Sequence, residues 1–259
     1  MERDVIGWSG LAASLTFVLL AVALTGRHRL GLSRGIGVAV GRSLVQMAVV
    51  GTALVPIVDP DTPLLWSWAW VLAIVGFAAV TTARRAPAVP GLVWVALAAN
   101  ALVGATGLSV IFGLGILELS GRTLVPVAGM IIGNSMKAAV VGAARMAESV
   151  ADHRPEIEAG LALGMTTRAA SKRLVRSSLR TAISPQVEQT AALGIVFLPG
   201  AMTGLILAGA EPLEAVRTQL ALMYVILAGV VMAATTTGLG TLARLTTPDA
   251  RVLPLDRVA

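Results

Sequence analysis

The sequence predicts an all-α polytopic membrane protein, a bundle of about seven transmembrane helices. Of the 259 residues, 56% are hydrophobic and only 13% are charged, and the mean hydropathy is +0.83. A soluble domain carries about 25% charged residues, because its surface has to be hydrated. The charged fraction of this chain is about half of that value, which excludes a soluble enzyme or binding domain. The chain has no cysteine, which also excludes a disulfide-stapled secreted domain.

Seven stretches are long and apolar enough to cross the hydrocarbon core, which takes about 20 residues of helix. They cover residues 5–25, 36–58, 64–83, 91–117, 123–144, 183–209 and 215–242. The fourth is unusually long and contains Asn100, Gly104 and Gly107, so we expect it to be tilted, kinked or partly re-entrant. The first could be mistaken for a signal peptide, but the residues before it carry no net positive charge, so we expect a retained helix.

The charges of the loops predict the orientation, because cytoplasmic loops are rich in Lys and Arg. Fifteen Lys and Arg residues lie in one set of alternate loops, 26–35, 84–90, 145–182 and 244–259. Two lie in the other set, 1–4, 59–63, 118–122 and 210–214. We therefore expect the N-terminus outside, the C-terminus in the cytoplasm, and one transmembrane domain over 1–259 in the plasma membrane. A pI of 11.1 does not indicate nucleic acid here, since the basic residues fall in short runs between apolar stretches.

One predicted cytoplasmic loop, about residues 150–182, is long enough to fold. Capping and breaking residues predict two helices joined by a tight turn. The first begins at Asp152 and ends at Gly164, and the second begins at Thr166 or Thr167 and runs on towards the sixth span. The loop is therefore a compact helix–turn–helix that can transmit a rigid-body push.

The second of these helices carries a basic stripe and an apolar stripe on opposite sides. The basic side chains recur every four residues, at Arg168, Lys172, Arg176 and Arg180. One interpretation is a helix on the inner leaflet, with its arginines on the anionic headgroups of membrane lipids. The other is a surface that docks onto another protein subunit.

Small residues and one proline mark the fifth and sixth spans. Gly129 and Gly133, like Gly200 and Gly204, form small-xxx-small patterns that allow helices to approach closely, or simply to pack. Pro199 removes a backbone donor within a span, which is tolerated only against protein or a water-filled path. We expect a hinge or pathway-lining segment there, with an ordinary kink as the alternative.

Lys137 and Glu188 are charged residues within the fifth and sixth predicted spans. Lys137 and Glu188 each cost at least about 2.5 kcal/mol near the bilayer centre unless they meet a partner or water. Both lie toward the cytoplasmic ends of their spans, so an ion pair between the fifth and sixth spans is one hypothesis. The uncharged polar residues within the spans are expected to form interhelical hydrogen bonds. They are Gln46, Asn100, Asn134, Ser135 and Gln219.

Three sequence blocks carry a family resemblance. They are GRSLVQ from residue 41, GMIIGNSM from residue 129 and LPGAMTG from residue 198. They are similar to the FetB-like family of ABC transporter permeases, over about residues 40–240. Bacterial members of that family are described as iron exporters, and plant members are linked to aluminium tolerance. Lys137 and Glu188 depart from the pattern of this family.

The resemblance implies a permease subunit that pairs with a second copy and is driven by separate ABC-type ATP-binding subunits. Glu158, Ala159 and Gly164 resemble the coupling loop of ABC permeases, in which an E-A-x4-G turn precedes a second helix. The residues expected to take part in ATPase coupling are Glu158, Ala159, Gly164, Arg168, Lys172 and Arg176. Those expected to line the pathway or act as hinges are Gly129, Met130, Gly133, Asn134, Lys137, Glu188, Pro199, Gly200, Met202 and Gly204.

The sequence contains no G-x4-G-K-[ST] motif, so we expect no cofactor on this chain and ATP hydrolysis by the partner. It also offers few ligands for a bare metal ion at membrane depth, since both histidines lie in predicted loops. The iron assignment therefore rests on the resemblance. A stand-alone secondary transporter or channel is the alternative, although it would carry several intramembrane acids. A membrane enzyme would need a nucleophile–base pair or a metal triad, neither of which is visible.

Overall fold

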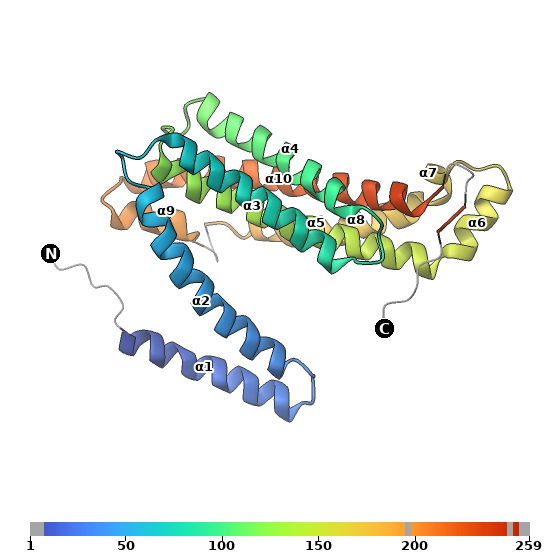
Figure 1. The fold of residues 1–259 in the computed structure, drawn as a ribbon, viewed down its shortest axis with the longest axis horizontal. Coiled ribbons are helices and arrows are strands. Elements are labelled where there is room, and N and C mark those ends of the chain that lie inside the picture. Colours follow the sequence, from blue (N-terminus) through green and yellow to red (C-terminus); the bar gives the residue numbers. More distant parts are fainter. Residues whose placement is uncertain (1–7, 195–197, 248–250, 254–259) are drawn as a thin grey trace. The chain divides into compact units, whose positions relative to one another are not determined.

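The computed structural model describes residues 8–194, 198–247 and 251–253, and these residues are predominantly helical (Figure 1). The backbone groups into two compact units, Met1–Ile57 and Val58–Ala259. Residues 5–7 of the first predicted span, residues 195–197 of the sixth, and parts of the two predicted terminal segments lie outside the described residues.

The first unit is a pair of helices, α1 (Trp8–Arg27) and α2 (Ser33–Ile57). Both are long and apolar enough to cross a membrane, and none of the residues in their apolar windows is buried by protein. Arg29 and Gly31 adopt positive φ angles in the turn between them, and the Thr25 and Ser33 hydroxyls lie 3.0 Å apart across it. The first two predicted spans are confirmed as helices within a few residues.

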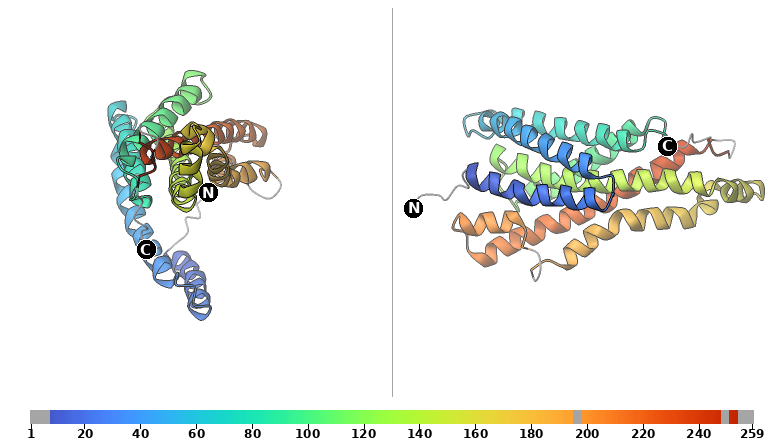
Figure 2. Two further views of the ribbon diagram at one scale, coloured as in Figure 1. Left: turned by 90° about the vertical axis from the view of Figure 1, so that its right-hand side faces the viewer. Right: turned by 90° about the horizontal axis from the view of Figure 1, so that it is seen from below.

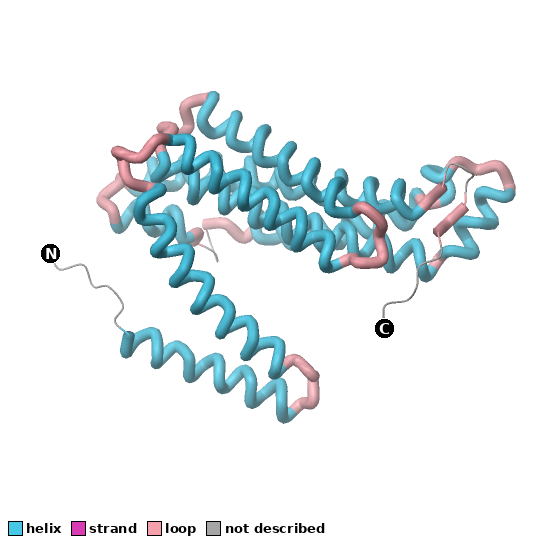
Figure 3. The backbone as a smooth tube through the Cα atoms, in the orientation of Figure 1, coloured by secondary structure: helices cyan, strands magenta, loops and turns pink. Residues whose placement is uncertain are grey.

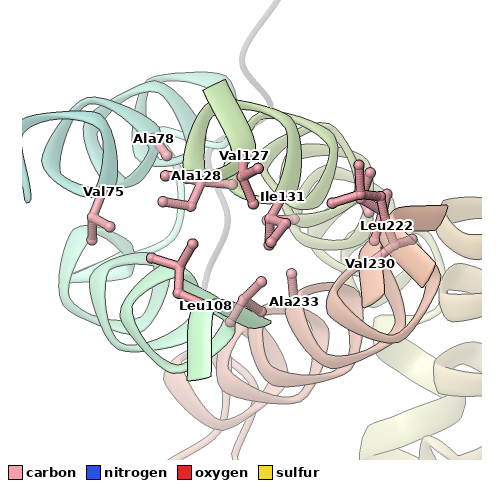
Figure 4. Close-up of a cluster of buried hydrophobic side chains, with 14 of the residues drawn as sticks. Val75, Ala78, Leu108, Val127, Ala128, Ile131, Leu222, Val230 and Ala233 are labelled. Carbon is pink, nitrogen blue, oxygen red and sulfur yellow. The ribbon is translucent and has the colours of Figure 1, made fainter. Parts of the chain in front are cut away.

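Four long helices form the core of the second unit: α3 (Leu64–Arg85), α4 (Leu92–Gly113), α5 (Gly121–Asp152) and α10 (Pro212–Leu245). They run alongside one another in the bundle (Figure 2). Their facing sides supply small and branched apolar residues that interdigitate (Figure 4). Examples are Val75 and Ala78 on α3, Leu108 on α4, Val127, Ala128 and Ile131 on α5, and Leu222, Val230 and Ala233 on α10.

Glycine sets the closest approach between these helices. A Cβ atom on Gly229 of α10 would lie 2.9 Å from the Ser135 hydroxyl of α5 and 2.9 Å from a methyl group of Val103 on α4. A Cβ on Gly142 would lie 3.2 Å from the backbone oxygen of Ala234. Three helices therefore cross at a contact that leaves no room for a side chain at position 229.

The fourth span is one uninterrupted helix from Leu92 to Gly113, so a re-entrant break is not present in it. Gly91 caps its start with a φ of 65°. Gly104 and Gly107 serve packing instead, since Cβ atoms there would contact Ile132 and Ile131 of α5 at 3.5 and 3.1 Å. The glycines that suggested bending therefore act as close-contact points between α4 and α5.

The sixth predicted span differs most from expectation, because 183–209 is not one helix. It is divided between the end of α8 (Lys172–Ala191) and the short α9 (Gly200–Leu207). Gly194 has a φ of +84°, and Pro199 lies immediately before the first turn of α9. These residues end one helix and delay the next, because a left-handed glycine closes a helix and proline cannot continue one.

The divided segment still passes once along the second unit, in keeping with about seven transmembrane helices. Six of the described helices are long and apolar enough to span alone. Two shorter helices, α6 (Arg154–Ala162) and α7 (Thr167–Ala170), lie at one end of the second unit, and α9 lies at the other (Figures 1 and 3). The path from α7 through α8 and α9 therefore crosses the bundle once, and α10 returns. The last turn of α3, which carries Arg84 and Arg85, and the end of α10 lie at the same end as α6 and α7.

Candidate functional site

The helix–turn–helix at one end of the bundle begins differently from the prediction. Helix α5 continues through Asp152, so His153 rather than Asp152 is the N-cap of α6. Pro155 and Glu156 do lie in the first turn, as expected. The apolar face of α6 is anchored by Ile157, which is fully buried against the neighbouring core.

The tight turn after α6 is built by Gly164. Its φ of +84° is one that side chains with a Cβ rarely adopt. The amide of Met165 donates to the carbonyl of Gly160 at 3.0 Å, which closes the end of α6. Thr166 then caps α7, its hydroxyl oxygen accepting from the amide of Ala169 at 3.3 Å. The predicted glycine turn and threonine cap are both present.

The second helix of this hairpin is interrupted, which the sequence did not indicate. Helix α7 ends at Ala170, and α8 starts after Ser171, so the predicted single helix is two. Helix α8 then passes through Pro185 and reaches Ala191. Ser171 is fully buried, and its hydroxyl donates to the carbonyl of Thr167 at 2.6 Å.

Ion pairs hold the hairpin together. Arg154 and Glu158 pair within α6 at 2.8 Å, and Arg173 of α8 contacts Glu156 of α6 at 2.8 Å. Each is largely solvent-exposed, so each contributes at most about 1 kcal/mol. The Arg173–Glu156 pair matters for the arrangement of the helices, since it joins α6 to α8.

The tip of the hairpin exposes an apolar side chain that the sequence analysis did not single out. Leu163, directly before Gly164, is 84% exposed, and the neighbouring Met165 is also exposed. Ala159 lies exposed on α6, and Glu158 is half-buried. The sequence feature that could have identified Leu163 is its position, since it is an apolar residue in a turn between two polar helices.

The predicted basic residues lie on the other side of this region. Arg168 on α7, with Lys172 and Arg176 on α8, lines a groove of about 870 Å³ whose opposite wall is the last part of α10. Leu239 and Leu242 belong to that wall. Three of the four basic residues of the stripe therefore line a cavity with an apolar side, whereas Arg180 lines a separate cavity.

Helix α8 connects this region to the interruption between α8 and α9. Its first half packs antiparallel to the end of α5, where the Ser178 hydroxyl lies 3.2 Å from that of Ser149 and 3.3 Å from the carbonyl of Arg145. Two turns further along α8, Gln186 is 7% exposed, and its side-chain nitrogen has no partner among the described residues. Helix α8 thus runs without interruption from the basic residues beside the α6–α7 hairpin to the break before α9.

The GMIIGNSM block presents two faces on α5. Ile131, Ile132 and Ser135 are fully buried in the bundle. The opposite face is half-exposed or exposed and consists of Gly129, Met130, Gly133, Asn134 and Lys137. A Cβ on either of these glycines would meet nothing within 4 Å among the described residues. The same holds for Gly200 and Gly204 on α9, where Met202 is half-exposed. The small-xxx-small patterns therefore do not join helices within the described chain.

Lys137 and Glu188 do not meet as an ion pair. Ser178 of α8 lies beside Arg145 and Ser149 of α5. Glu188 is ten residues further along α8, and Lys137 is about ten residues back along α5. The two residues therefore lie at similar positions along the antiparallel helices, and this register alone would allow them to pair. Both side chains are exposed, however, and none of the three ion pairs of the described residues includes either one. Lys137 instead donates to the Asn134 side-chain oxygen at 3.4 Å.

The interhelical hydrogen bonds expected of the uncharged polar residues are also not formed among the described residues. The amide groups of Asn100 and Asn134 each donate to a carbonyl one turn earlier in their own helix, at 2.8 Å. Gln46, in the first unit, is exposed. Buried polar atoms of several helices have no hydrogen-bond partner in the described part of the chain. They are Asn100 Oδ1, Ser135 Oγ, Gln186 Nε2, Gln219 Oε1 and Thr241 Oγ1.

Metal-binding side chains do not gather within the described residues. No three His, Cys, Asp or Glu residues there come close enough to hold a metal ion. The polar groups within the predicted spans instead include amides, hydroxyls, the amine of Lys137 and the single carboxylate of Glu188.

Comparison with known proteins gives a consistent result. A protein-family model described as "Uncharacterised protein family (UPF0014)" matches residues 8–245. The chain is 34% identical to the rice protein "UPF0014 membrane protein STAR2", over 86% of this chain and 78% of that protein. It is 31% identical to the Escherichia coli protein "Probable iron export permease protein FetB", over 84% and 83% of the two chains.

A further relative is "Protein ALUMINUM SENSITIVE 3" of Arabidopsis thaliana, 30% identical over 82% of this chain and 77% of that protein. No solved structure matches. The match over nearly all of the chain, together with its apolar helices, places this multi-pass membrane protein in the UPF0014 family.

Proposed function

We propose that this chain is the membrane-spanning permease subunit of an ABC-type transporter, driven by a separate ATP-hydrolysing subunit. The observation that carries the proposal is the continuity of α8. This helix starts beside the α6–α7 hairpin and ends at the interruption before α9, so a displacement of the hairpin is delivered to the break as a rigid-body movement.

The docking surface in this proposal is α6 and the turn that follows it. Glu158 and Ala159 lie on α6, Gly164 forms the turn, and Leu163 presents an exposed apolar side chain at the tip. A short helix with one apolar anchor and one charged anchor suits a groove on a partner subunit. The Arg173–Glu156 pair would pass its movement to α8.

The pathway in this proposal runs along the break between α8 and α9 and the unpacked face of α5. Non-helical backbone at membrane depth is tolerated where it is buried in protein or lines a water-filled cavity. Interrupted helices of this kind form substrate sites in other transporters, because their free amide and carbonyl groups face the path. Gly129, Gly133 and Asn134 supply small and polar surface on α5.

A second copy of the chain is part of the proposal. The unfilled space beside Gly129 and Gly133, and beside Gly200 and Gly204, is what a close helix–helix contact requires. Pairing of two permeases would also enclose the exposed Lys137 and Glu188. Both charges would then face a shared path rather than lipid.

The cargo we propose is iron or another metal, carried outward, in the form of a complex. The printed name of the Escherichia coli relative supports iron export by analogy. The chemistry of this chain favours a complexed, anionic or amphiphilic form, since Lys137 contributes a positive charge and no acidic cluster occurs in the described residues.

A co-purification experiment tests the proposal. The tagged full chain is extracted in mild detergent from its native membrane, beside a Glu158→Ala, Gly164→Pro double variant. Pro fixes φ near −65° and cannot adopt the angle of +84° found at Gly164. Gly115→Pro is the matched control, because Gly115 also has positive φ, at 66°, and lies in the loop after α4, at the opposite end of the bundle.

We expect an ABC-type ATPase to co-purify with the native chain and the control, and to be lost from the double variant. ATP-driven metal flux in vesicles would then identify the cargo. If no ATPase accompanies the native chain, the proposal fails and a stand-alone transporter takes its place. If the double variant retains the ATPase, the docking surface is not α6 and its turn.

A further inference from the structure

We propose that the groove between α8 and the end of α10 is a binding site for one anionic phospholipid of the adjoining leaflet. The phosphate group would lie among Arg168, Lys172 and Arg176, and an acyl chain would lie on the apolar wall. This inference goes beyond the proposed function, since it requires neither the ATPase nor a particular cargo.

The mouth of the groove is positively charged. Arg168, Lys172 and Arg176 succeed one another at intervals of four residues and line the same cavity. None of them takes part in the three ion pairs of the described residues, whereas Arg173 on the same helix contacts Glu156. Thr166 and Thr167 line the mouth as well. Three cations without a carboxylate partner form a site that favours phosphate.

The floor of the groove is apolar and leads inward. Val175 and Leu179 continue from the basic residues along α8, and Leu239 and Leu242 face them from α10. Leu179 lies seven residues beyond Lys172, which is roughly 10 Å of helix. Leu239 is 44% exposed in the described structure, so the floor is open.

Charge and apolar surface together select the kind of ligand. A free inorganic anion would use the basic mouth and leave the apolar floor uncovered. A protein docking on the exposed tip of the hairpin would contact Leu163, which does not line the groove. An amphiphile with an anionic head and an alkyl chain matches both parts, and the inner leaflet supplies such molecules next to basic segments.

The test measures phospholipid binding to the purified full-length chain by native mass spectrometry. Dioleoyl phosphatidylglycerol is titrated against the protein, with dioleoyl phosphatidylcholine as the zwitterionic comparison. Inorganic phosphate and glycerophosphoglycerol, which has the headgroup without the chains, are the two soluble competitors.

Two variants remove the two halves of the site. Lys172→Gln with Arg176→Gln removes two charges from the mouth, and Leu239→Trp fills the floor without changing the charge. Arg84→Gln with Arg85→Gln is the matched control, because it removes two exposed arginines at the same end of the bundle that do not line the groove. Helicity and melting temperature verify that each variant is folded.

We expect phosphatidylglycerol to bind about 30-fold more weakly to the mouth variant, which corresponds to about 1 kcal/mol for each basic residue. We expect Leu239→Trp to weaken binding as well, and the control to change it less than about threefold. Equal weakening in the control, equal binding of phosphatidylcholine, or full competition by phosphate would overturn the proposal. So would an ATPase subunit that is lost from the mouth variant while phosphatidylglycerol stays bound.

Discussion

Replacing Gly229 by valine should separate three helices at the centre of the bundle. A Cβ atom there would lie 2.9 Å from both Ser135 Oγ on α5 and Val103 Cγ1 on α4. Carbon atoms in contact prefer about 3.5–4.0 Å, so α10 would have to move by roughly 0.6–1.1 Å, and the two methyl groups of valine add to the conflict.

The expected loss of stability follows from two opposing terms. Overpacking of this kind costs about 1–3 kcal/mol, and the upper part of that range applies because two neighbours on different helices are affected. Valine is a better helix former than glycine by about 0.4 kcal/mol, which offsets part of the cost. We therefore expect Gly229→Val to lower the free energy of unfolding by about 2 kcal/mol.

The matched control is Gly76→Val on α3, because a Cβ there would meet nothing within 4 Å in the described chain. Only the helix-propensity term applies to it, so its stability should stay level or rise slightly. Both variants are unfolded with sodium dodecyl sulfate in mixed micelles, and loss of structure is followed by tryptophan fluorescence. If Gly229→Val unfolds within about 0.5 kcal/mol of Gly76→Val, this account of the helix crossing is refuted.

Three further outcomes follow from the described side chains. Exchanging the charges of Lys137 and Glu188 should not rescue the transport defect of either single swap, because the structure does not pair them; rescue in vesicle flux would contradict this. Gln186→Leu should leave the melting temperature unchanged or raise it, since it removes a buried amide nitrogen that has no hydrogen-bond partner among the described residues. It should also reduce transport flux if that amide faces the pathway. A lower melting temperature would mean that the amide has a partner. Because the chain has no cysteine, single-cysteine variants report on which side of the membrane a loop lies. Glu118→Cys should react with an impermeant maleimide in intact cells, and Ala162→Cys should react only after permeabilisation. The reverse result would invert the predicted orientation.

The sequence predicted the number and positions of the crossings well, because hydropathy over about 20 residues depends on composition alone. It did not predict the division of 183–209, since an apolar segment scores the same whether its backbone is helical or not. Gly194 and Pro199 were the available signals. A glycine followed by a proline five residues later indicates that the helix is interrupted, whereas a proline alone within a membrane helix usually indicates a kink.

The candidate site was predicted in its elements but not in its contacts. The turn at Gly164 and the cap at Thr166 are local features, so their sequence signals were sufficient. The packing partners of glycines were not, because a small-xxx-small pattern permits a close approach without identifying the neighbour. Gly133 belongs to such a pattern, but a Cβ there would meet no described neighbour within 4 Å, whereas Gly229 belongs to none that we singled out and lies where α5, α4 and α10 cross.

The interruption between α8 and α9 also bears on how the chain enters the membrane. The apolar end of α8 and the eight residues of α9 each supply well under the roughly 20 residues that a translocon releases into lipid as one span. We expect this part of the chain to wait until α10 has been synthesised and offers a protein surface. A chain truncated after Gly209 should therefore leave its last segment accessible to protease on the side where synthesis occurs, and protection of that segment would show that it inserts unaided.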